Sequence, residues 1–185
     1  MSKDQDGYNE YYDLDSYLFN KVTTNFHKNH KLTLEEFVCI LIWKSNRSRG
    51  KIISKIKNRY PDRSLSKAVE ELTKEIYEQN SHKERLCFLV GNRKIKETSI
   101  PLATSSAILT VLYPDYFTVY DIRVCNALGK YHHIGERTFD SLWRGYEEFR
   151  ADVMKNAPGK TLRDKDKWLW GKSFIQDLRK DMKKW

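Results

Sequence analysis

Apolar residues recur at helical spacing along most of the chain. In several segments they return every three or four positions, which is the period of a helix that buries one face. These segments are residues 11–30, 33–43, 65–76, 83–90, 102–113, 122–128, 139–153 and 174–185. The pattern predicts an all-α fold of roughly eight to ten helices.

Capping and turn residues predict where several helices begin and end. Thr33 and Glu36 have the spacing of a capping box, so a helix should start immediately after Thr33. Pro101 is suited to open the next apolar segment, and Pro114 should turn the chain after it. Gly129 should close the short helix that follows Asp121.

The chain length allows one domain or two small lobes. A chain of 185 residues that is 39% hydrophobic can bury a core of its own. We expect a single compact unit over residues 1–185. The alternative is two lobes with a cleft between them, one of residues 31–130 and the other of residues 1–30 together with 131–185.

The charge of the chain favours a polyanionic partner. Lys and Arg total 34 against 25 Asp and Glu, a formal net charge of +9, and such an excess attracts nucleic acid. Basic residues gather after the apolar segment that ends at Trp43, and for Lys55, Lys57 and Arg59 among them solvated surface charge is the default interpretation. The basic residues are Lys44, Arg47, Arg49, Lys51, Lys55, Lys57 and Arg59.

Other chemical signals are weak. Cys39, Cys87 and Cys125 are widely spaced and lie among apolar residues, so we expect reduced thiols and no metal site. The first residues lack the apolar core of a secretory signal, and the run from Phe37 to Trp43 is too short to cross a bilayer. We therefore expect no membrane partner and a cytoplasmic protein, associated with the nucleoid or, in a eukaryote, nuclear.

The stretch IPLATSSAILTVLYPDYFTVYDIRV, residues 100–124, resembles a known family. Its small-residue helix, extended TVY segment and VYDIRV context resemble the helix-hairpin-helix DNA glycosylases related to endonuclease III. The resemblance spans roughly residues 34–128. It implies a helix-hairpin-helix glycosylase-like fold, duplex DNA as the partner, and Asp121 as the catalytic acid of base excision.

Asp121 suits two roles. Cleavage of an N-glycosidic bond develops positive charge on the deoxyribose, and a nearby carboxylate can stabilise that charge or activate water. An Asp directly before a helix is also a common N-cap. The two roles are compatible.

The resemblance also bears on the reaction type and on cofactors. Bifunctional members carry a nucleophilic Lys where this chain has Ala103, which implies a monofunctional enzyme. Lys44 is the candidate for a replacement amine, since desolvation beside Trp43 could lower its pKa, although a phosphate-contacting Lys is the preferred interpretation. The family's iron-sulfur cluster needs four C-terminal cysteines that are not present, so we expect no cofactor.

Two segments are candidates for contacting DNA. The start of the helix after Pro101 has small side chains, which let N–H groups and hydroxyls approach phosphates, and the basic segment lies where the family distorts DNA. The candidate DNA-binding residues are Asn46, Arg47, Arg49, Lys51, Pro101, Ala103, Thr104, Ser105 and Arg123. The sequence thus predicts a monofunctional DNA glycosylase. The alternatives are a non-catalytic helix-hairpin-helix DNA-binding module and a helical protein-interaction domain.

Overall fold

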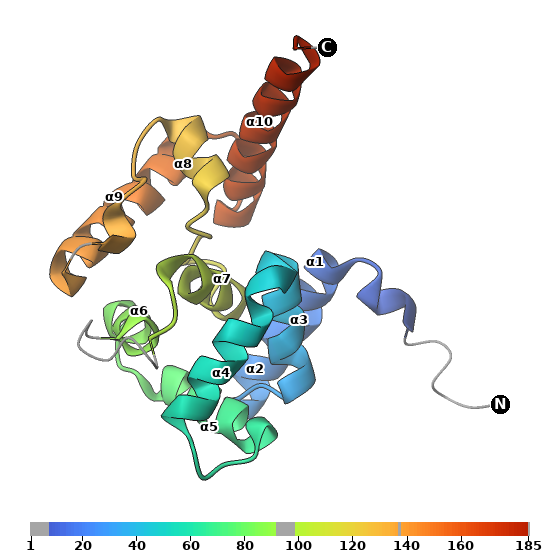
Figure 1. The fold of residues 1–185 in the computed structure, drawn as a ribbon, viewed down its shortest axis with the longest axis vertical. Coiled ribbons are helices and arrows are strands. Elements are labelled where there is room, and N and C mark those ends of the chain that lie inside the picture. Colours follow the sequence, from blue (N-terminus) through green and yellow to red (C-terminus); the bar gives the residue numbers. More distant parts are fainter. Residues whose placement is uncertain (1–7, 92–98, 137, 185) are drawn as a thin grey trace. The chain divides into compact units, whose positions relative to one another are not determined.

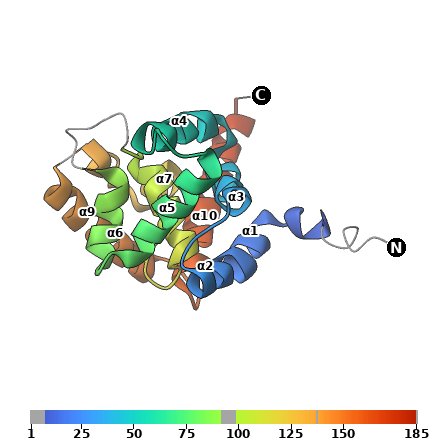
Figure 2. The ribbon, with the colours of Figure 1, turned by 90° about the horizontal axis from the view of Figure 1, so that it is seen from below.

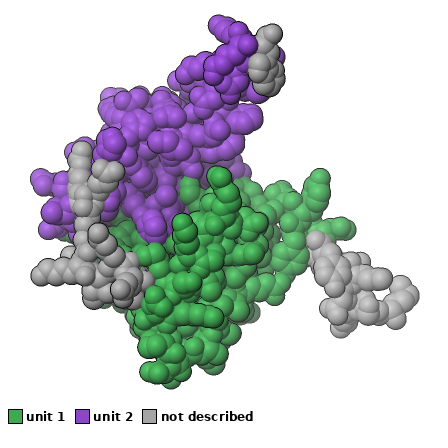
Figure 3. Space-filling view, viewed as in Figure 1, with its two compact units in different colours: residues 1–100, 111–113 green, residues 101–110, 114–185 purple. Residues whose placement is uncertain are grey.

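The computed structural model describes residues 8–91, 99–136 and 138–184, and within these ranges the chain is all-helical, as predicted (Figure 1). It divides into two compact units (Figure 3). Unit 1 comprises residues 1–100 and 111–113, and unit 2 comprises residues 101–110 and 114–185. In this division the N-terminal helices belong to unit 1, whereas the two-lobe alternative to a single unit placed residues 1–30 with residues 131–185.

Unit 1 begins with an interrupted helical run in place of one regular helix. Asp13 caps it by accepting a hydrogen bond from the N–H of Ser16, and His30 ends it in the left-handed region with φ 60°. Leu18, Val22 and Phe26 are fully buried. The elements are η1 (Tyr8–Tyr11), α1 (Leu14–Tyr17), the π-helix η2 (Leu18–Val22) and α2 (Thr23–Asn29).

The capping box at the next helix is confirmed. Thr33 Oγ1 accepts from the N–H of Glu36 at 3.2 Å, and Glu36 Oε2 accepts from the N–H of Thr33 at 2.8 Å. The second carboxylate oxygen of Glu36 accepts from Asn25 Nδ2 at 2.9 Å. These bonds join the start of α3 (Leu34–Ser45) to α2 and explain how Glu36 is buried without loss of its partners.

Three further helices complete the core of unit 1. They are α4 (Arg49–Arg59), which follows the short η3 (Asn46–Ser48), α5 (Leu65–Glu78) and α6 (His82–Val90). α3, α4 and α5 contact one another and lie side by side (Figure 2). Ser64 and Ser81 cap α5 and α6 through their hydroxyls.

Unit 2 contains most of α7 (Leu102–Leu112), together with α8 (Ile122–Leu128), η4 (Ile134–Glu136), α9 (Phe139–Asn156) and α10 (Leu162–Met182). The predicted start of the last helix at residue 174 is wrong. α10 begins at Leu162, where Thr161 and Asp164 form a second capping box. Its buried stripe includes Asp166 and Ser173, so polar residues interrupt the apolar period that would reveal its first half.

A tyrosine in the core of unit 2 holds the loop that leads to α8. The Tyr146 hydroxyl of α9 donates to the carbonyl of Thr118 at 2.6 Å and accepts from the N–H of Thr118 at 3.1 Å. Tyr146 is fully buried, and burial raises the pKa of its hydroxyl. One side chain therefore satisfies both backbone groups of a buried loop residue.

We predict that Tyr146→Phe destabilises the protein, because the ring remains while both backbone groups of Thr118 lose their partner. The expected loss in the free energy of unfolding is about 2 kcal/mol. Urea denaturation measures it. Tyr116→Phe is the control, since the Tyr116 hydroxyl donates to the side chain of the partly buried Glu147 at 3.0 Å and not to a buried backbone group. Equal losses in the two variants would contradict the role of Tyr146.

Candidate nucleic-acid interface and acidic site

Asp121 is the N-cap of α8. Its Oδ1 accepts a hydrogen bond from the N–H of Arg123 at 2.9 Å, and its backbone is extended, with φ −129° and ψ 141°. The helix ends at Gly129 in the left-handed region, φ 72°, as the sequence predicts. The side chain is half-buried. Of the two roles predicted for Asp121, the cap is therefore confirmed, and its catalytic role stays a prediction.

The segment before Asp121 is held on several sides. The N–H of Tyr120 donates to Ser106 Oγ of α7 at 2.9 Å, and the Tyr120 hydroxyl donates to the carbonyl of Tyr131 at 2.5 Å. Two residues earlier, Thr118 is bonded to Tyr146. Asp121 thus stands at the end of a segment with little freedom to move, which is the property a preorganised carboxylate requires.

Arg123 pairs with a residue far along the chain. Its Nη1 lies 3.0 Å from Asp177 Oδ2 of α10, and its guanidinium lies 5.2 Å from the ring centroids of both Trp170 and Phe174. The sequence predicts a DNA contact for Arg123, and that contact stays a prediction. Within the protein Arg123 joins α8 to α10, and no local pattern reveals a partner 54 residues away.

Polar groups at the start of α7 form hydrogen bonds within the helix. The N–H groups of Thr104 and Ser105 both donate to the carbonyl of Pro101 at 2.9 Å, and both side chains are buried. Ala103 is half-buried and Pro101 is exposed. The predicted turn between α6 and α7 falls largely on residues 92–98, which lie outside the described residues.

The basic segment forms the end of α3, the turn η3 and the whole of α4. Residues 37–61 contain seven Lys and Arg and no Asp or Glu, a net charge of +7 compared with +9 for the whole chain. Burial of Ile52 and Ile56 fixes which side of α4 faces the core. The remaining predicted residues of this segment are exposed and follow one another along the chain: Asn46, Arg47, Arg49 and Lys51.

Not every cation of the segment is available to a ligand. Arg59 folds back onto α6, where its Nη1 donates to the carbonyl of Phe88 at 3.0 Å and its guanidinium lies 3.9 Å from the Phe88 ring centroid. Lys44 is half-buried in the last turn of α3. Beside it, Trp43 donates from Nε1 to Asp15 at 3.2 Å, so this indole has a structural role.

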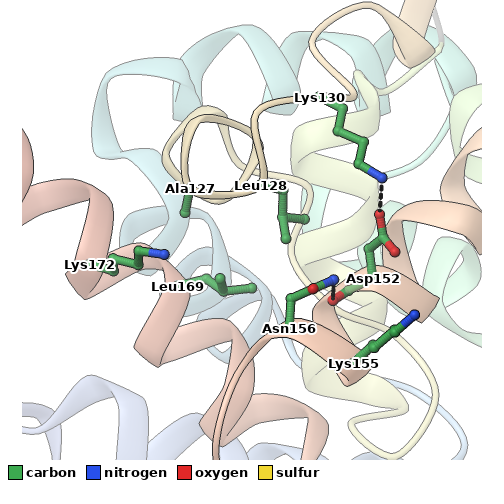
Figure 4. Close-up of a pocket in the computed structure, with 8 residues that line it drawn as sticks. All are labelled: Ala127, Leu128, Lys130, Asp152, Lys155, Asn156, Leu169 and Lys172. Carbon is green, nitrogen blue, oxygen red and sulfur yellow. Dashed lines mark hydrogen bonds and ion pairs between the residues drawn. The ribbon is translucent and has the colours of Figure 1, made fainter.

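A separate pocket of about 350 Å³ lies within unit 2 (Figure 4). Lys130 Nζ lies 2.7 Å from Asp152 Oδ2, and the Tyr131 hydroxyl donates to the same oxygen at 2.6 Å. These two hydrogen bonds hold the pKa of Asp152 below its ordinary value. The lining residues are Ala127, Leu128, Lys130, Asp152, Lys155, Asn156, Leu169 and Lys172.

This pocket includes none of the residues predicted from the sequence. Three lysines and one carboxylate line it, so its charge suits an anion, but in Figure 4 the Lys130 ammonium points at Asp152 while that of Lys155 points away from Lys172. Its residues come from α8, the loop after it, α9 and α10, and nothing in the sequence indicates that they meet. The ammonium groups do not converge on one point.

Among the described residues, no three His, Cys, Asp or Glu side chains are grouped so that they could hold a metal ion. None of the described helices combines the length and the apolar composition that crossing a membrane requires.

Comparison with known proteins identifies no family for this chain. No family model matches the sequence, and no curated protein or solved structure is significantly similar to it.

We predict that Asp152→Asn destabilises the protein in a pH-dependent way. Because the pKa of Asp152 is lowered on folding, its carboxylate contributes fully above the unfolded value of about 3.9 and loses that contribution as the pH falls through the folded value. The difference in unfolding free energy between wild type and variant should therefore shrink in acid. Urea denaturation across this pH range measures it.

Asp181→Asn is the control for this experiment. Asp181 pairs with Lys184 at 2.8 Å, but both side chains are exposed, so the variant should cost little at any pH. A constant difference between Asp152→Asn and the wild type from neutral to acid pH would contradict the assigned ion pair.

Proposed function

We propose that this protein binds duplex DNA and hydrolyses the N-glycosidic bond of a flipped base with the help of Asp121, as a monofunctional DNA glycosylase. The observation that carries the DNA-binding part is the acid-free segment of residues 37–61. It exposes the cationic side chains of Arg47, Arg49 and Lys51 on η3 and the start of α4. The glycosylase part rests on Asp121 and on the resemblance of its surroundings to the helix-hairpin-helix family.

The basic segment supports binding to a phosphate backbone. Each cation that neutralises a phosphate releases counterions, so a run of cations without acids binds a polyanion better than the same number paired with carboxylates. Arg47, Arg49 and Lys51 lie within five consecutive residues and are all exposed. A Cβ added at Gly50 would meet no atom within 4 Å, so the surface between these side chains is open to a ligand.

The position of Asp121 supports a role at the sugar. The N-terminus of a helix favours a negative charge, and here the carboxylate is held by the N–H of Arg123 at the end of a fixed segment. In the proposed reaction the carboxylate takes a proton from the attacking water as the water oxygen bonds to the sugar carbon. The bond between that carbon and the base nitrogen breaks, the base leaves with the electron pair and gains a proton from solvent, and Asp121 returns its proton to solvent.

A non-catalytic DNA-binding module is the second candidate, and two observations favour it. Asp121 already has a structural task as the N-cap of α8. Ala103 occupies the position where the family's lyases carry their amine. Lys44, the candidate for a replacement amine, lies in the basic segment of unit 1. In this alternative the scaffold and the basic segment keep DNA affinity, and no base is released.

We predict that the triple variant Arg47→Gln, Arg49→Gln and Lys51→Gln weakens binding to duplex DNA. If each side chain neutralises one phosphate, the slope of log K against log salt should become shallower by about 2.7, which is 0.9 per lost contact. Fluorescence anisotropy over a salt series, with a labelled duplex, measures this slope.

The matched control removes the same charge elsewhere in unit 1. Arg63, Lys67 and Lys74 are exposed, and each forms an ion pair with Glu71, Glu70 or Glu78 of α5. Replacing these three by Gln should change the salt slope little. Equal weakening by both triple variants would mean that net charge alone attracts DNA, and it would remove the assigned surface.

We further predict that Asp121→Asn keeps DNA affinity and reduces base release by about a hundredfold or more. Asn is as good an N-cap as Asp, so α8 should remain folded, and Asp121→Ala separates loss of the cap from loss of the charge. Release is measured on duplexes that carry a broad set of damaged bases, with alkaline strand scission as the readout. Borohydride should trap no covalent complex.

Two results would count against the glycosylase. A wild-type protein that binds these duplexes tightly but releases no base would establish the non-catalytic alternative. A fully active Asp121→Asn variant would show that catalysis depends on another group.

A further inference from the structure

The helix α10 exposes an unusual number of large apolar side chains. Six of them are between 39% and 61% exposed, whereas most other large apolar residues of the described chain are buried. They are Trp168, Trp170, Phe174, Ile175, Leu178 and Met182. Exposed apolar residues gathered in one place commonly mark an interaction surface.

Packing within unit 2 does not account for this apolar surface. α10 contacts α8 and α9, and its buried residues form a different stripe, Leu162, Asp166, Leu169 and Ser173. At 100° per residue, Leu178 and Met182 point almost directly away from that stripe. α10 therefore has one buried face that packs within unit 2 and a second face whose apolar residues are exposed.

Two of the six side chains take part in the contact between α8 and α10. The rings of Trp170 and Phe174 stack on each other with centroids 5.5 Å apart, and the guanidinium of Arg123 lies 5.2 Å from each. The ring of Trp168 has a contact within its own helix, since Lys172 Nζ of α10 lies 5.4 Å from its centroid. The four that remain, Trp168, Ile175, Leu178 and Met182, are here called the α10 stripe.

The α10 stripe has the spacing of a helix-pairing seam. Trp168, Ile175 and Met182 are seven residues apart, and Leu178 lies three residues after Ile175, so they occupy a and d positions of a heptad. Gly171 takes the remaining d position, and a Cβ added there would meet no atom within 4 Å. A seven-residue period is the one by which two helices bury a shared seam.

The charges beside the stripe indicate which kind of helix fits. In this register the flanking e and g positions hold Lys167, Lys172 and Arg179 against the single acid Asp181. In a pair formed by two copies of α10 these cations would meet like charges, which disfavours self-association. A helix with Glu or Asp at its flanking positions would be attracted.

We propose that the α10 stripe is a docking site for an acidic amphipathic helix of a partner protein. The partner places an apolar a and d seam against Trp168, Ile175, Leu178 and Met182, and its carboxylates pair with the flanking cations. This is the helix-in-groove type of recognition, read by residues at helical spacing. The site is separate from the basic segment of unit 1 and does not depend on the function proposed above.

Nucleic acid and membrane surfaces fit the stripe less well. Stacking on bases needs free aromatic faces, whereas three of the four stripe residues are aliphatic or Met. A helix that lies in a membrane surface has a broad apolar face and a basic polar face, whereas this stripe is narrow and Asp177 and Asp181 follow one side of its last turns.

The test uses a labelled synthetic peptide of three heptads with Leu or Ile at a and d and Glu at e and g. Its own Glu residues keep it from pairing with itself. Fluorescence anisotropy should show binding to the full chain, and the double variant Ile175→Gln and Leu178→Gln should weaken that binding by about tenfold or more. Both residues are exposed, so circular dichroism should show an unchanged fold.

Matched controls separate the seam from general effects. Gln176→Ala and Lys180→Gln alter exposed positions of the same helix outside the a, d, e and g register, and they should leave peptide affinity within about twofold. A second peptide with Lys in place of Glu should bind at least tenfold more weakly than the acidic one. Duplex DNA affinity of the Ile175 and Leu178 double variant should equal that of the wild type.

Several results would overturn the proposal. One is no binding of the acidic peptide, and another is equal binding of the acidic and lysine peptides. A dimer in light scattering that the double variant dissociates would assign the stripe to a second copy of this chain. Loss of DNA affinity, or of binding to anionic lipid vesicles, in the double variant would assign it to those partners instead.

Discussion

The hydrogen bonds between the Tyr146 hydroxyl and the backbone of Thr118 are the interaction on which unit 2 depends. The loop between α7 and α8 is buried here, and a buried loop must satisfy its N–H and carbonyl groups without a helix. Tyr146 does so from α9, while Ser106 of α7 does so for Tyr120. Because α7 and α9 both hold this loop through hydrogen bonds, the start of α8, and with it Asp121, has a defined position.

The sequence predicted best those features that local chemistry determines. The capping box of Thr33 and Glu36, the cap formed by Asp121 and the ending of α8 at Gly129 each involve neighbours a few residues apart, and all three are observed. The first half of α10 was missed because buried Asp166 and Ser173 replace apolar residues in its inward stripe. A prediction based only on the spacing of apolar residues cannot identify a buried position that holds a polar residue.

The features that could not be predicted join residues distant in sequence. Arg123 contacts Asp177, Trp170 and Phe174 of α10, and no sequence pattern indicates these partners. The pocket formed by α8, α9 and α10 has no sequence signature either, since its lysines are ordinary surface residues until the helices pack. Side-chain partners across a helical fold follow from packing angles, and spacing along one helix does not encode them.

The surfaces of the two units have different chemistry, which argues for two kinds of partner. On α4 of unit 1 the exposed residues between the cations are small or polar, namely Gly50, Ser54 and Asn58, so a flat polyanion could approach closely while burying little apolar area. On α10 of unit 2 the cations flank the apolar side chains of the α10 stripe, and covering that stripe with a phosphate backbone would leave Ile175 and Leu178 without apolar contact. Positive charge alone would predict the same kind of partner for both surfaces. The residues between the charges distinguish a surface for nucleic acid from one for a helix.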